Sequence, residues 1–295
     1  MHWIEYVVIK VFYGLFSKIS FRTAQFFADL LSLVLQHIVQ YRRKVILENL
    51  KRVYGDNLPA DQKILLRNIY RNFTYLWFEV LQAGKLNDKN FNNHFEIHNL
   101  DILEKAINEK KGVVLVSGHF GNFEWIACLF GINNWPFAGI AKKQKNKRVD
   151  DFIRKTREKN GADVIYTKSA IKDGLKFIKN GGVLGIVGDQ DARHKGIFVN
   201  FLGIPSSTAV GTAIFHLRSG APLIFIIAIR TRYAHFKIYI EEVPVSEVEG
   251  ISDEAIQKVT QTYSDILSKW VLEYPEQWFW MHKRWKTSPP AAVKP

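Results

Sequence analysis

The sequence predicts an α/β fold in which a mixed, largely parallel sheet is flanked by helices. Three observations carry this prediction. Short apolar runs rich in β-branched residues recur along the chain, segments with helical spacing of apolar residues separate them, and 47% of the residues are hydrophobic, which suffices for a large core. The length of 295 residues would admit two domains, but no linker-like change of composition divides the chain. We therefore expect one domain over residues 42–287, preceded by N-terminal helices at 1–41 and followed by a flexible tail at 288–295.

Residues 1–41 carry many apolar and aromatic side chains, interrupted by charges such as Glu5, Lys10 and Asp29. The longest uncharged run, residues 30–41, is shorter than the about 20 apolar residues that a membrane-spanning helix needs. Two interpretations stay open: helices that lie in a membrane interface with basic side chains at the head groups, and an ordinary buried helical pair. No small-residue cleavage site follows, so we do not expect a removable signal peptide.

The remaining elements are expected in the following order. Apolar spacing predicts helices within residues 41–86, separated by a turn at 55–59. Strands are expected at 112–117, 162–166, 183–187 and 223–230, with helices between them, and a strand of alternating polarity at 236–241 suits a sheet edge. A helix over 253–274 would be ended by Pro275.

Charge and cysteine content narrow the class of protein. Lys and Arg outnumber Asp and Glu by 41 to 28, a formal charge of +13, which suits an anionic membrane surface, a phosphorylated substrate or nucleic acid. The chain has a single cysteine, Cys128, which rules out an internal disulfide and a thiolate-rich zinc site. We find no DNA- or RNA-binding signature, no P-loop and no GxSxG elbow, so nucleic-acid binding, nucleotide hydrolysis and α/β-hydrolase chemistry are not expected.

The residues around His119 are the most informative part of the sequence. His119 follows a predicted strand, with Gly118 before it and Gly121 after it, and Glu124 lies five residues further on. On one continuous helix this spacing would put the two side chains about 140° apart, so His119 must precede the helix if they are to meet. Glu124 could then reach back and fix the imidazole tautomer, as a general base for acyl transfer requires. Backbone N–H groups at the helix start could face an oxyanion or an anionic substrate, and a purely structural histidine remains the alternative.

Several blocks, in order along the chain, resemble the bacterial lipid A biosynthesis acyltransferases, a family within the HX4D/E lysophospholipid acyltransferase-like superfamily. The blocks are RKVILENL at 43–50, GHFGNFE at 118–124, GDQD at 188–191 with GIFVNFLG at 196–203, and PEQWFWMHKRWK at 275–286. The first block resembles an Arg…Asn-Leu helix of the family. Glu79 stands where a later helix of the family carries an acidic residue.

The resemblance implies transfer of a fatty acyl chain from an acyl carrier protein or coenzyme A thioester to a hydroxyl of a lipid A precursor. It needs no cofactor beyond that donor, and it places the enzyme at the cytoplasmic face of the inner membrane of a Gram-negative bacterium. His119 would be the base and Glu124 would orient it. Substrate-binding roles would fall to Gly121, Asn122, Lys142, Arg157, Asp189 and Asp191.

Alternatives remain open at this point. Asp189 and Asp191 could be turn or capping carboxylates, and the basic run at 142–148, which departs from the family pattern at Lys142, could be a solvated loop or a site for an anionic partner. The tryptophans at 278–285 suit a membrane interface and also a core edge, and we expect each to hold in part. The same chemistry could act on an aminolipid, a glycolipid or a polyene pigment lipid, and a membrane-surface binding protein with an inert His119 is a different class altogether.

Overall fold

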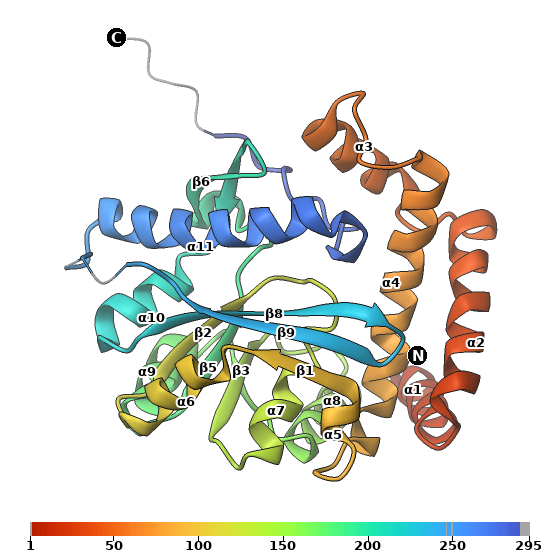
Figure 1. The fold of residues 1–295 in the computed structure, drawn as a ribbon, viewed down its shortest axis with the longest axis horizontal. Coiled ribbons are helices and arrows are strands. Elements are labelled where there is room, and N and C mark those ends of the chain that lie inside the picture. The colour runs from red at the N-terminus through yellow and green to blue at the C-terminus, as the bar shows by residue number, and fades with distance from the viewer. Residues whose placement is uncertain (1, 246, 249, 290–295) are drawn as a thin grey trace.

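The protein is built around a seven-stranded sheet with the order β1-β9-β8-β2-β5-β3-β4 (Figure 1). The computed structural model describes residues 2–245, 247–248 and 250–289. Every neighbouring pair of strands is parallel except β8 and β9, which are antiparallel. The predicted mixed, largely parallel sheet is therefore confirmed. The strands are β1 (Phe95–His98), β2 (Val113–Ser117), β3 (Phe137–Ala141), β4 (Asp163–Tyr166), β5 (Val183–Val187), β8 (Leu223–Arg232) and β9 (His235–Glu242).

The strands with continuous apolar runs lie where the sequence predicts them, but four strands were missed. Two of these, β1 and β3, belong to the main sheet. The other two form a separate antiparallel hairpin, β6 (Ile197–Phe201) and β7 (Ile204–Thr208). β1 is only four residues long and β3 reads FAGIA, with one β-branched residue, so neither gives the β-rich signal on which the prediction relied.

Helices cover both faces of the sheet, as Figure 1 shows, and two hydrophobic clusters fill the space beneath them. Side chains of β8 alternate between these clusters: Leu223 and Phe225 pack on one side, Ile224 and Ile226 on the other. The helices after the N-terminal region are α3 (Arg43–Tyr54), α4 (Gln62–Gln82), α5 (Phe91–His94), α6 (Leu100–Asn108), α7 (Ile126–Ile132), α8 (Lys147–Lys159), α9 (Ala170–Lys179), α10 (Gly211–Ser219) and α11 (Asp253–Glu273). The first cluster includes residues of α9, α10 and α11, and the second includes residues of α6 and α7. Short 3-10 helices lie at Ala83–Lys85, Arg193–Lys195 and Pro275–Gln277.

The N-terminal region forms α1 (His2–Phe16), α2 (Phe21–Leu33) and a π-helical turn at Val34–Ile38. In Figure 1, α1 and α2 lie beside α4 at one end of the sheet. Small residues let α2 approach α4 closely, and Asp29 accepts hydrogen bonds from Arg71 Nε (2.9 Å) and Tyr75 Oη (2.8 Å). The rings of Tyr6 and Tyr13 pack edge-on against Phe152 of α8.

Much of this N-terminal surface is both apolar and exposed. No residue of α1 is buried. Ile4, Val8, Val11 and Leu15 recur at helical spacing and are 48–64% exposed, and we refer to them as the α1 stripe. None of the helices in the described part of the chain is long and apolar enough to cross a membrane. The predicted tail at 288–295 lies outside the described residues from 290 onward.

Candidate active site

His119 lies just beyond the carboxyl end of β2, in a turn that connects the strand to α7. Because α7 begins only at Ile126, the turn spans residues 118–125. The imidazole Nδ1 lies 2.6 Å from Asp189 Oδ1, and the backbone N–H of His119 donates to Asp189 Oδ2 at 2.9 Å. Asp189 follows β5, the strand that pairs with β2, so the parallel register brings the two residues together although they are 70 positions apart.

Asp189 is held in a form that suits an imidazole partner. Its carboxylate is buried and also accepts a hydrogen bond from Trp278 Nε1 at 2.8 Å. Burial alone would raise the pKa of this carboxyl group, but the charge of His119 and the hydrogen bonds from His119 and Trp278 outweigh it and lower the pKa to about 2. An ionised Asp189 requires the proton of a neutral His119 ring to be on Nδ1, which leaves Nε2 free to act as a base.

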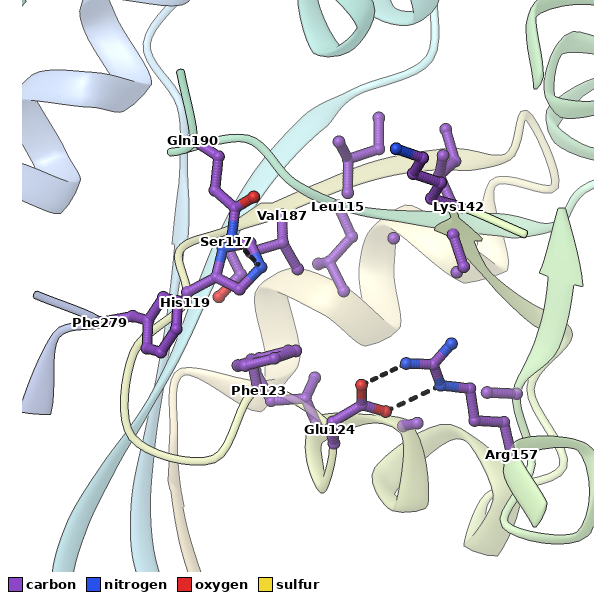
Figure 2. A pocket seen from close by; sticks show the side chains of 18 of the residues that line it. Leu115, Ser117, His119, Phe123, Glu124, Lys142, Arg157, Val187, Gln190 and Phe279 are labelled. Atoms are coloured by element: carbon purple, nitrogen blue, oxygen red, sulfur yellow. Dashed lines mark hydrogen bonds and ion pairs between the residues drawn. The ribbon is translucent and has the colours of Figure 1, made fainter. Parts of the chain in front are cut away.

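Glu124 does not contact His119, and the predicted His119–Glu124 pair is therefore wrong. Glu124 instead forms a two-pronged ion pair with Arg157 of α8, with Arg157 Nε donating to Glu124 Oε2 at 3.0 Å and Nη2 donating to Oε1 (Figure 2). The turn that carries Glu124 points its side chain along the pocket toward α8, while Asp189 already occupies Nδ1 of the imidazole. The ion pair joins two residues predicted to act separately, Glu124 as an orienting group and Arg157 as a substrate ligand.

Gly121 and Asn122 shape the turn. Gly121 has φ +51°, and a Cβ there would overlap the carbonyl oxygen of Ala228, so only glycine fits without a shift. Its N–H donates to the carbonyl of Gln277 at 3.0 Å, so it is not free to face an oxyanion. Asn122 is fully buried and was wrongly predicted to bind substrate, because its side chain holds the turn itself: Nδ2 donates to Glu79 and Oδ1 accepts from the N–H of Trp125.

Beneath the turn lies a buried ion pair between Glu79 of α4 and Arg230 of β8. Arg230 Nε and Nη2 donate to the two Glu79 carboxylate oxygens at 3.0 and 2.7 Å. Glu79 also accepts from Asn122 Nδ2 and from the N–H of Ala234, both at 2.9 Å. Sequence reasoning found Glu79 only through the family resemblance and missed Arg230, for which the signal was an arginine within an otherwise apolar strand. Removing one partner of such a pair is costly because it leaves an uncompensated buried charge. The pair therefore holds Glu79 in place, and Glu79 in turn supports the His119 turn through Asn122.

The C-terminal segment lies against the same turn. The N–H of Phe279 donates to the carbonyl of His119 at 3.0 Å, and Trp278 and Phe120 form an isolated bridge. Trp278, Trp280 and Trp285 are 0–6% exposed, so the core interpretation of these tryptophans is correct and the membrane-interface interpretation is wrong.

Asp191 forms its hydrogen bonds with the C-terminal segment. Its N–H donates to His282 Nε2 at 2.9 Å, and its Oδ2 accepts from Thr287 at 3.1 Å. Burial lowers the pKa of His282, which keeps the ring neutral and able to accept this hydrogen bond. Neither Asp189 nor Asp191 lines the pocket described next, so the expectation that these two carboxylates touch substrate directly is not met.

A pocket of about 780 Å³ opens beside His119. Its polar lining includes Ser117, His119, Glu124, Arg157 and Gln190, which Figure 2 labels. Apolar or small residues make up much of the rest. Six of them, which we call the apolar arm, are Leu115, Ile126, Ala127, Phe137, Gly139 and Ala162. The arrangement places the imidazole of His119 beside apolar walls, a site suited to a hydroxyl nucleophile and a substrate with a long hydrocarbon chain.

The basic run at 142–148 lies at the edge of this pocket. Lys142 lines it and is exposed, and the other cations of the run are exposed as well. Asn146, in contrast, is buried: it accepts a hydrogen bond from the N–H of Arg148 at the start of α8, and its Nδ2 donates to Glu5 of α1 at 2.9 Å. The run therefore combines a structural amide with a solvated cationic surface.

Among the described residues, no group of three or more His, Cys, Asp and Glu side chains is placed to hold a metal ion. Cys128 is buried, which raises the pKa of its thiol to about 12 and makes it a poor nucleophile.

Comparison with known proteins identifies the family of the chain. The family model of the bacterial lipid A biosynthesis acyltransferases matches residues 1–287. The chain is 21% identical over 291 residues to a lipid A biosynthesis palmitoleoyltransferase of Escherichia coli, which covers 98% of this chain and 92% of that protein. It is 22% identical over 253 residues to the lauroyltransferase of the same organism (84% and 80% covered) and over 245 residues to a phosphatidylinositol mannoside acyltransferase of Mycobacterium tuberculosis (81% and 75%). The chain therefore belongs to the bacterial lipid A biosynthesis acyltransferase family and is an acyltransferase.

Proposed function

We propose that this enzyme transfers a fatty acyl chain from an acyl carrier protein or coenzyme A thioester to a hydroxyl of a lipid A precursor, with His119 as the general base. The observation that carries the proposal is the position of His119 Nε2 at the entrance of an apolar pocket, with Nδ1 held by the buried Asp189. Asp189 keeps the ring in the tautomer that accepts the hydroxyl proton and stabilises the imidazolium that results.

The reaction would run as an ordinary acyl transfer. The acceptor oxygen attacks the thioester carbon while the hydroxyl proton passes to Nε2 of His119. The C–S bond then breaks, and the departing thiolate takes this proton from the imidazolium. The comparison of lipid A by mass spectrometry from strains with and without the gene tests the acceptor. A missing acyl chain in the deletion strain is the expected result, and unchanged lipid A together with an altered second lipid would identify a different acceptor.

The apolar arm offers a place for the acyl chain, and Gly139 offers a way to test it. Gly139 pairs with Gly185 across β3 and β5, and a Cβ built at Gly139 meets nothing within 4 Å. We expect Gly139→Leu to shift donor preference toward chains shorter by about two to four carbons, because each excluded methylene forfeits about 0.8 kcal/mol of burial. Competition between thioesters of different length, resolved by mass spectrometry, measures the shift.

Gly14→Leu is the matched control, because a Cβ at Gly14 also meets open space but lies on α1, outside the pocket. Gly139→Ala should give a smaller shift in the same direction. An unchanged chain-length preference in Gly139→Leu would show that the acyl chain does not bind in the apolar arm.

We also propose that the α1 stripe attaches the enzyme to the cytoplasmic face of the inner membrane. Full burial of an exposed apolar side chain is favourable by about 1.5–3 kcal/mol of transfer free energy, so insertion of the α1 stripe into a membrane interface is favourable. We expect Ile4→Gln combined with Leu15→Gln to weaken binding to phosphatidylglycerol-containing vesicles by about tenfold or more. Cosedimentation measures the loss.

The control for this test uses equally exposed apolar residues elsewhere. Ile251 and Leu272 are 54% and 51% exposed, close to the 64% and 59% of Ile4 and Leu15, and lie outside the N-terminal helices. The pair Ile251→Gln and Leu272→Gln should bind vesicles like the unmodified protein. Equal losses in both pairs would show that general surface apolarity, rather than the α1 stripe, holds the enzyme at a membrane.

A further inference from the structure

The Nε2 lone pair of His119, the one that would accept the hydroxyl proton, already has a hydrogen-bond partner in Gln190. The amide nitrogen of Gln190 lies 3.1 Å from His119 Nε2 (Figure 2). Because Nδ1 faces the ionised Asp189 and carries the ring proton, Nε2 of the neutral ring can only accept, so the Gln190 amide must present its N–H to it. Gln190 thus fills the position that a substrate hydroxyl has to take.

The acceptor hydroxyl and Gln190 cannot both donate to one lone pair. Binding of the hydroxyl must therefore release the Gln190 amide from Nε2. The released N–H groups stay next to the reacting carbon, since Gln190 follows Asp189 directly and Asp189 is fixed by its three hydrogen bonds to His119 and Trp278. An amide freed at this point is well placed to meet negative charge that develops on the thioester oxygen.

Ser117 is a second hydrogen-bond donor that lines the same pocket as His119. Ser117 is the last residue of β2, lines the pocket and is only 8% exposed. Among the residues that the structure describes, no group forms a hydrogen bond with its Oγ. An unsatisfied buried hydroxyl costs about 1–3 kcal/mol, a cost that is relieved when an acceptor atom enters the pocket.

Three backbone N–H groups of the turn are already used within the fold. The N–H of His119 donates to Asp189, that of Phe120 to the carbonyl of Gly118 and that of Gly121 to the carbonyl of Gln277. These three groups are therefore not available to a developing charge beside His119.

We propose that Ser117 Oγ and Gln190 Nε2 together bind the oxyanion of the tetrahedral intermediate, Gln190 being released from His119 by the incoming hydroxyl. The inference rests on the proposed acyl transfer by His119. When the acceptor oxygen bonds to the thioester carbon, its proton moves to Nε2 and the carbonyl electron pair moves to oxygen, where the two donors bind it. When the C–S bond breaks, the carbonyl re-forms, the thiolate takes the proton from Nε2, and Gln190 returns to the free lone pair after the ester leaves.

The test measures kcat and KM of the full-length enzyme with dodecanoyl-coenzyme A, by thiol release with and without a lipid A precursor. Ser117→Ala and Gln190→Ala should each lower kcat by about 10²–10³-fold, with a much smaller change in KM, because the oxyanion exists only after attack. Gln190→Glu should lose more than Gln190→Ala, because a carboxylate repels the oxyanion. Ser117→Cys, which keeps a weak donor, should lie between Ser117→Ala and the unmodified enzyme.

Two controls separate this role from a structural one. Thr212→Val removes another buried hydroxyl that lacks a partner among the described residues but does not line the pocket, and it should leave kcat near the unmodified value. Ser117→Ala should unfold at or above the temperature of the unmodified protein, because it removes an unsatisfied group.

The outcomes are distinguishable from those of the proposed function. If Gln190 only blocks the base, Gln190→Ala will raise kcat or lower KM for the acceptor, and unchanged kcat in Ser117→Ala would also overturn the inference. If the precursor is not acylated but slow thioester hydrolysis still depends on Ser117 and Gln190, the acceptor is wrong and the oxyanion site stands.

Discussion

Replacement of His119 by alanine should lower the turnover of acyl transfer by about 10²–10⁴-fold, the usual contribution of a positioned general base. The side chain is 22% exposed and points into the pocket, so its loss leaves the core intact. Without Nε2 the acceptor hydroxyl must attack with its proton in place. Single-turnover assays with purified protein measure the effect on the chemical step.

His98→Ala is a suitable control, because His98 lies on β1 outside the pocket and should tolerate the change. Circular dichroism establishes that both variants are folded. A folded His119→Ala enzyme with near-normal turnover would exclude His119 as the base.

Asp189→Asn should produce a loss of similar size, roughly 10²–10⁴-fold in kcat, because an amide neither fixes the Nδ1–H tautomer nor stabilises the imidazolium. Glu124→Gln should act differently. It disturbs the ion pair with Arg157, so its effect should not add to that of Arg157→Gln in a double-mutant cycle, while it should add to that of Asp189→Asn. Coupling of Glu124 to His119 rather than to Arg157 would restore the partner that the sequence suggested.

The pKa of Asp189 also sets a stability window. Its folded value of about 2 lies below the unfolded value of about 3.9, so its contribution to stability is present above about pH 4 and is lost as the pH falls toward 2. Asp189→Asn should therefore lose less stability than the unmodified protein over that range, as measured by denaturant unfolding at each pH. A parallel fall in stability of the two proteins would contradict an ionised, paired Asp189.

The strands that are apolar on both faces could be predicted well. Val113–Ser117 is buried throughout, and strands of this kind are recognisable in the sequence as continuous runs of β-branched residues. β1 lacks this signal because it is short and polar at two of its four positions. β3 lacks it because its sequence FAGIA contains a glycine, Gly139, and one β-branched residue. Helix α11 was predicted within one residue because its stripe of apolar side chains is long and Pro275 follows it.

The site could be predicted only in part, because spacing along the chain reveals neighbours in sequence and not across the sheet. Glu124 is five residues from His119 and was chosen as its partner, whereas Asp189 reaches it through the pairing of β2 with β5. Arg230 was missed for the same reason, since no feature of the neighbouring sequence indicates that β8 places Arg230 next to Glu79. The tryptophans of residues 278–285 were ambiguous because indoles alternating with cations suit both a buried segment and a membrane surface.

The contact between Phe279 and His119 has a consequence for how the enzyme comes into being. The turn that carries the base is completed by residues that the ribosome adds more than 150 positions later, so a chain still under synthesis holds His119 without the segment that fixes it. Such a nascent chain lacks the contacts of Gln277, Trp278 and Phe279 with the reaction centre. We therefore expect activity only after residues 277–279 have left the ribosome and docked.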